Sequence, residues 1–83
     1  MFINKLPDGQ CNLCGGKLRE YRKARGLSQR QVADLLQLNG LDIDKNAIQR
    51  IEAGKRFVTD IELYFLCTVF AVSPLNFWEA SKQ

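Results

Sequence analysis

The chain has 83 residues, of which 46% are hydrophobic, so it is large enough for one small domain with a folded core. It has no histidine, no phosphate-binding loop and no pair of carboxylates at a useful spacing, which disfavours an enzyme and gives no reason to expect a cofactor. The net charge of +3 is modest, the apolar runs are far shorter than a membrane span, and the N-terminus does not read as a signal peptide, so we expect a cytoplasmic protein.

The N-terminal residues show no helical pattern. They include Pro7-Asp8-Gly9, a sequence typical of a turn. We therefore predict that residues 1–14 form an N-terminal arm, whose first dozen residues make a flexible segment or a turn, and that residues 15–80 form the folded domain.

Start and stop signals divide the rest of the chain into five short helices. Two capping residues are followed three positions later by Gln31 and Glu62, which is the spacing of a capping box. Gly26, Gly40 and Gly54 stand where helices are expected to stop. The predicted helices span residues 15–25, 29–38, 45–53, 60–70 and 74–79, and the last four begin after Ser28, Asp44, Thr59 and Ser73.

Basic residues are concentrated near the start of this domain. Six lysines and arginines and one glutamate lie between Lys17 and Arg30, whereas residues 59–79 contain three acidic residues and no basic one. This asymmetry predicts a polyanionic partner on one side of the molecule. An ordinary solvated helix face explains the charge equally well.

The predicted helix at residues 45–53 favours the first interpretation. Ile48 and Ile51 lie on one side of it, so that side is expected to pack inward. The opposite arc carries side chains of the types that read base edges in the major groove, namely Lys45, Asn46, Gln49 and Arg50. The alternative is an amphipathic helix whose polar face only meets water.

Five sequence motifs follow one another from Leu18 to Phe77. They are Leu18–Lys23, Gly26–Gln29, Val32–Leu36, Ile48–Arg56, and finally Leu63, Leu66, Phe70 and Val72-Ser73. In order and spacing this stretch resembles the Cro and phage-repressor type of helix-turn-helix regulators, also called XRE-like. The resemblance implies an all-α fold of five short helices, a lambda-repressor-like DNA-binding domain over residues 15–80.

The resemblance also implies roles for individual residues. The four outward residues of the helix at 45–53 match base-reading positions. Arg22 and Glu52 match a pair that joins the first and third helices by a salt bridge. The residues expected to contact the DNA backbone are Gln29, Arg30, Lys55 and Arg56.

The chain departs from the family pattern at two places. The turn before residue 45 is longer than the usual three or four residues, because residues 39–43 are added to it. A bacterial subgroup of the family has such a turn, although its length leaves the tilt of the recognition helix open. The position after the fourth helix, usually glycine, is Ala71, and a left-handed alanine costs about 1 kcal/mol.

The three cysteines do not make a complete metal site. Zinc needs four ligands, and the chain offers Cys11-x-x-Cys14, a distant Cys67 and no histidine. We expect no metal, with a site shared between two copies of the pair as the alternative. Cys67 is expected to be a small buried residue.

The predicted fourth helix is apolar almost all round, so it must be covered on more than one side. The expected partner surface consists of Tyr64, Phe65, Val69, Leu75 and Trp78. A second copy of the chain is the preferred occupant, and an N-terminal arm carrying Phe2 and Ile3 is the alternative.

Taken together, these features predict a transcriptional regulator that binds double-stranded DNA as a homodimer, with repression favoured over activation. The alternative function is a protein-interaction module, such as an antitoxin, whose apolar C-terminal helices bind a second protein.

Overall fold

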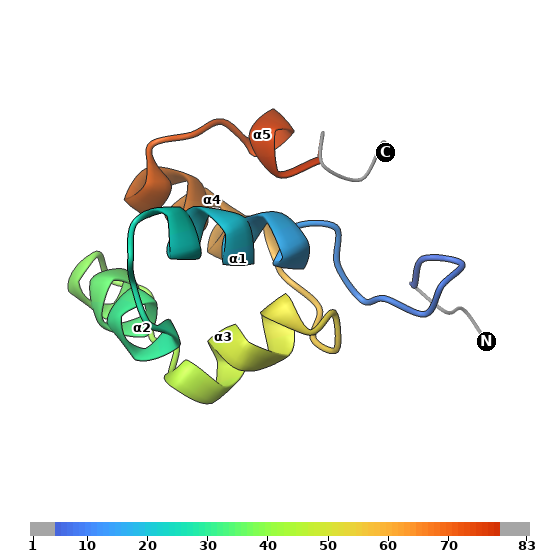
Figure 1. The fold of residues 1–83 in the computed structure, drawn as a ribbon, viewed down its shortest axis with the longest axis horizontal. Helices are drawn as coiled ribbons and strands as arrows, with labels where there is room; N and C mark the ends of the chain where they lie inside the picture. Colours follow the sequence, from blue (N-terminus) through green and yellow to red (C-terminus); the bar gives the residue numbers. More distant parts are fainter. Residues whose placement is uncertain (1–4, 79–83) are drawn as a thin grey trace.

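The computed structural model describes residues 5–78, which form five α-helices and no strand (Figure 1). The predicted all-α fold is confirmed, and the ends of the first four helices differ from the predicted ones by no more than one residue, while the predicted end of the fifth, residue 79, lies outside the described residues. Residues 1–4 and 79–83, which include Phe2 and Ile3, lie outside the described part of the chain. The helices are α1 (Gly15–Ala24), α2 (Gln29–Leu38), α3 (Lys45–Glu52), α4 (Asp60–Phe70) and α5 (Pro74–Trp78).

Capping side chains start the middle helices where the sequence predicts. Ser28 Oγ accepts a hydrogen bond of 3.0 Å from the Gln31 backbone N–H, and Gln31 Oε1 accepts one of 2.8 Å from the Ser28 backbone N–H. Thr59 and Glu62 form the same reciprocal pair at α4. These bonds satisfy donors that a helix start otherwise leaves without partners.

The start of α5 is built differently from the prediction. The Ser73 hydroxyl does not accept a backbone N–H but donates to Asn76 Oδ1 at 3.1 Å. The same Asn76 oxygen accepts the Ser73 backbone N–H at 2.9 Å. The Asn76 side chain, which belongs to α5, therefore binds Ser73, the residue just before the helix.

One hydrophobic core lies between the helices. α1 contacts α3 and α5, α2 contacts α3 and α4, and α4 contacts α5. The largest fully buried side chains of this core come from all five helices. They are Leu18, Val32, Leu36, Ile48, Ile51, Leu66, Phe70 and Phe77.

Within the described residues no helix is long and apolar enough to cross a membrane.

The end of α4 is strained and then stabilised by an arginine from α1. Ala71 has φ 55° and ψ 46°, the left-handed conformation that the sequence suggested. Arg25 donates hydrogen bonds to the Val69 carbonyl oxygen at 3.0 Å and to the Phe70 carbonyl oxygen at 2.7 Å. The guanidinium also lies 5.1 Å from the centre of the Phe70 ring. A cation at a helix C-terminus is favourable, so Arg25 offsets part of the strain.

Replacing Ala71 with glycine should therefore raise the free energy of unfolding by about 0.5–1 kcal/mol, because glycine adopts the left-handed conformation without a Cβ penalty. Urea unfolding measures the change. Ala24→Gly is the matched control, since Ala24 is exposed in right-handed helix α1 and glycine there should destabilise. Equal effects of the two substitutions would show that Ala71 is not strained.

Candidate nucleic-acid interface

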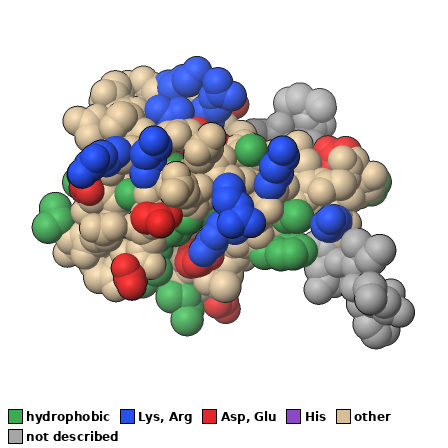
Figure 2. Space-filling view, turned by 90° about the horizontal axis from the view of Figure 1, so that it is seen from below, with side chains coloured by type: hydrophobic (Ala, Val, Ile, Leu, Met, Phe, Trp, Pro, Cys, Tyr) green, Lys and Arg blue, Asp and Glu red, His purple; other side chains and the backbone are tan. Residues whose placement is uncertain are grey.

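Helix α3 presents two opposite faces. Ile48 and Ile51 are 0% exposed and pack into the core. The four candidate base-reading side chains, Lys45, Asn46, Gln49 and Arg50, are all exposed. Because α3 is the lowest element of Figure 1, its outer face is turned toward the viewer in Figure 2.

The longer turn before α3 is itself folded. Gln37 Nε2 donates to the Ile43 carbonyl oxygen at 2.7 Å, and the Leu41 backbone N–H donates to the Leu36 carbonyl oxygen at 3.0 Å. The Ile43 side chain is buried in the core, and Asp44 Oδ1 caps the first turn of α3. The added residues therefore hold the start of α3 in a defined position rather than loosening it.

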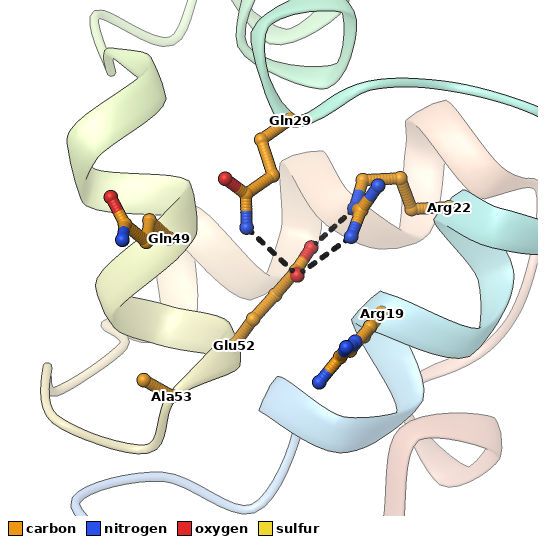
Figure 3. A pocket seen from close by; sticks show the side chains of 6 residues that line it. All are labelled: Arg19, Arg22, Gln29, Gln49, Glu52 and Ala53. Carbon is orange, nitrogen blue, oxygen red and sulfur yellow. Dashed lines mark hydrogen bonds and ion pairs between the residues drawn. The ribbon is translucent and has the colours of Figure 1, made fainter.

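Glu52 joins three helices at the other end of α3. Its Oε2 accepts from Arg22 Nε at 2.7 Å, and its Oε1 accepts from Arg22 Nη2 and Gln29 Nε2, each at 3.1 Å (Figure 3). The Glu52 side chain is 5% exposed and that of Arg22 is 12% exposed. The hydrogen bond from Arg22 to Glu52 raises the pKa of the Arg22 guanidinium, which therefore stays charged. One carboxylate thus ties α1 and the start of α2 to α3.

Asn12 is a positioning residue that the sequence did not reveal. Its Nδ2 donates to the Ile51 carbonyl oxygen at 3.1 Å and to the Arg56 carbonyl oxygen at 2.8 Å, while its Oδ1 accepts the Gly15 backbone N–H at 2.8 Å. A Cβ on Gly15 would collide with the Ile51 carbonyl oxygen. The start of α1 therefore packs directly on the end of α3, and only glycine allows that approach.

Residues 10–14 are therefore held against the end of α3. Besides the Asn12 contacts, the Cys11 backbone N–H donates to the Gly54 carbonyl oxygen at 2.8 Å. These contacts span about forty positions of the chain, and a turn signal such as Pro7-Asp8-Gly9 carries no information about such distant partners.

The two basic residues after α3 have different surroundings. Lys55 is exposed, and its side chain makes no hydrogen bond or ion pair within residues 5–78. Arg56 instead forms two hydrogen bonds with the Glu62 carboxylate, of 2.9 Å and 3.0 Å. The bond from Arg56 is the main reason that the pKa of Glu62 is lowered. Arg56 is thus already occupied, whereas Lys55 and the exposed Arg30 on α2 point to solvent.

The basic side chains are unevenly distributed over this face. In Figure 2 the lysines and arginines lie mainly across the upper half, and most of the acidic side chains lie below them. Such an arrangement favours a linear polyanion that crosses one part of the face.

The three cysteines are free and differ in burial, since only Cys14 is buried. Cys14 is buried in the core, and burial raises the pKa of its thiol to about 11. Burial also raises the pKa of the Cys67 thiol. Both thiols are therefore weaker acids than a free cysteine in the metal-free protein. Within the described residues no three metal-ligating side chains come together.

The expected partner surface is only partly exposed. Tyr64 is 65% exposed and Leu75 is exposed as well, whereas Phe65 and Val69 are half-buried. Phe65 lies beside Gly40 in the turn before α3. The Trp78 side chain lies outside what the structure describes. An apolar groove instead opens between α4 and α5, and its lining includes Leu63, Tyr64, Cys67, Ala71 and Val72.

Comparisons with known proteins agree with this geometry. Residues 18–77 match the family model described as "Helix-turn-helix". The fold is similar to the crystal structure of the restriction-modification controller protein C.AhdI from Aeromonas hydrophila, with a TM-score of 0.65 and 32% sequence identity over 76% of this chain and 84% of that one. A comparison with curated protein sequences gives no match.

Replacing Glu52 with glutamine should lower the free energy of unfolding by about 3 kcal/mol, because it leaves the largely buried Arg22 guanidinium without its counter-charge. Thermal and urea unfolding measure this loss. Glu20→Gln is the matched control, since the exposed Glu20 pairs with Lys17 on the surface of α1 and should contribute little. The preference among DNA sequences should change less than stability. Unchanged stability with an altered preference would contradict the structural role of Glu52.

Proposed function

This chain belongs to the helix-turn-helix family, in its Cro and phage-repressor type, and from that premise we propose a transcriptional regulator that reads the major groove of DNA with α3. The fold subtype and the DNA-binding class follow from the family. We propose in addition which residues read the bases, that the protein is a dimer and that it represses transcription.

The observation that carries the proposal is the polarity of α3. Two isoleucines fix one side of the helix in the core, while lysine, asparagine, glutamine and arginine occupy the exposed side. These four side-chain types make the bidentate or direct contacts that distinguish base pairs. A helix of eight residues held at both ends can present them to a groove in one orientation.

Contacts to the DNA backbone would fix the register of α3. Gln29 stands at the start of α2 and contacts Glu52 of α3, so it can meet a phosphate while it supports the recognition helix. Arg30 and Lys55 are exposed and uncommitted within the described residues. Arg56 supports the loop through Glu62, and we assign it a smaller share of phosphate binding.

The groove between α4 and α5 supports a homodimer. Tyr64 and Cys67 lie on one side of α4 at helical spacing, and together with Ala71 just after the helix they leave an apolar surface there. A second copy of the same surface covers it in a two-fold dimer. Such a dimer carries two α3 helices, so its operator is an inverted repeat with half-sites about 34–36 Å apart. A dimer bound at a promoter can block RNA polymerase without any further partner, and we therefore favour repression over activation.

The same groove also favours a second candidate function. If a different protein covers α4 and α5, the chain is an antitoxin-like module that binds that protein through its apolar face. The oligomeric state of the free protein separates the two candidates.

Arg50→Ala should weaken binding to the preferred duplex by about 1–3 kcal/mol, because the outward arginine is lost from base recognition. The preferred sequence comes first from selection of bound duplexes out of a random pool, and titration of that duplex and of a random one then gives both affinities. Binding to random DNA should fall much less.

Arg30→Ala is the control for Arg50→Ala, since it removes an exposed arginine from α2 and should weaken both duplexes alike. An equal loss on both duplexes for Arg50→Ala would contradict its role as a base-reading residue.

Tyr64→Glu should convert the protein from a dimer to a monomer at micromolar concentration, because a charge in the apolar groove must be desolvated on association. Sedimentation equilibrium of DNA-free protein measures the mass. Leu38→Glu is the control, since Leu38 is an exposed leucine at the end of α2, outside the groove, and its replacement should leave the dimer intact. A monomeric wild-type protein would instead favour the antitoxin-like candidate.

A further inference from the structure

A small polar pocket lies where α1, α2 and α3 meet (Figure 3). It is open to solvent, has a volume of about 230 Å³ and can admit a group of the size of a phosphate. Its lining consists of Arg19, Arg22, Gln29, Gln49, Glu52 and Ala53.

The charges in this pocket do not cancel. The Glu52 carboxylate accepts three hydrogen bonds from Arg22 and Gln29. Its negative charge is therefore neutralised by the positive charge of Arg22. Arg19 extends from α1 toward the same opening, and Figure 3 draws no bond between it and Glu52. Within residues 5–78 the Arg19 side chain has no hydrogen bond or ion pair. The pocket therefore carries one uncompensated positive charge.

The pocket also borders the outer face of α3. Gln49 lines it and belongs to the exposed arc of candidate base-reading residues. A duplex whose bases meet that arc would carry its phosphates along the edges of α3, because the backbones flank the groove that the helix enters. A guanidinium group at that edge is suited to bind a phosphate, because it can donate two parallel N–H hydrogen bonds to it.

We propose that the Arg19 pocket binds a backbone phosphate of the DNA duplex, with Arg19 as the cation that contacts it and the Arg22–Glu52 pair as the fixed wall behind it. The inference rests on the proposed function, because it adds a contact to the same interface. Free phosphate ions share the chemistry of the ligand, and the experiment separates the two sources.

The test compares Arg19→Gln with Lys17→Gln, two substitutions on α1 that each remove one positive charge. Residues two positions apart on a helix point in opposite directions. Lys17 faces away from the pocket, since its ammonium pairs with Glu20 at 3.3 Å and lies 5.5 Å from the centre of the Tyr21 ring. The control therefore changes the net charge equally without touching the pocket.

The affinity of each protein for a random-sequence duplex is measured over a range of sodium chloride concentrations. Arg19→Gln should reduce the steepness of the log–log salt dependence by about one unit, the value for one lost phosphate contact. Lys17→Gln should leave it unchanged, and both variants should keep the wild-type melting temperature. Equal slopes for the two variants would overturn the proposal.

A second arm exchanges chloride for inorganic phosphate at constant ionic strength. Any phosphate-specific loss of duplex affinity should be smaller in Arg19→Gln than in the wild-type protein, because free phosphate can compete with the duplex only where both bind. A phosphate-dependent rise in the melting temperature of the DNA-free wild-type protein that Arg19→Gln abolishes, together with an unchanged salt slope for Arg19→Gln, would reassign the pocket to free phosphate and overturn the duplex assignment. Failure of the proposed function looks different, since the wild-type protein would then show no salt-dependent binding to any duplex.

Discussion

The Glu52 carboxylate is the contact on which the candidate interface depends. It lies at the last position of α3 and accepts hydrogen bonds from α1 through Arg22 and from the first residue of α2 through Gln29. A charge that is only 5% exposed is costly unless its partners are complete, so the three helices are fixed relative to one another. The orientation of α3, the proposed recognition helix, follows from that arrangement.

Both ends of α3 are held by groups from other parts of the chain. At its start, the folded turn places Ile43 in the core and Asp44 as the cap. At its end, Asn12 binds the Ile51 carbonyl oxygen and also the loop that follows α3. A short helix gains little stability from its own backbone. These contacts therefore supply the rigidity that the proposed base reading by α3 requires.

The molecule separates a polar, basic face from an apolar one. The outer side of α3 and the start of α2 carry amides and cations, while α4 and α5 leave an apolar groove. The two surfaces suit different partners, a polyanion and an apolar protein surface. The proposed dimeric regulator needs one surface of each kind, since one would read DNA and the other would join the two copies.

The sequence by itself determined the helices, because the capping bonds of Ser28 and Thr59 join groups three residues apart. Periodicity likewise separated the buried from the exposed side of α3, and motif spacing predicted the family. Only the tertiary structure decided which charges are free. Arg56 is a basic loop residue in the sequence, yet it is bound by Glu62 in the fold, whereas Arg19 has no partner within the described residues. The bonds of Asn12 join groups about forty positions apart, and no local pattern encodes contacts that exist only after the core has packed.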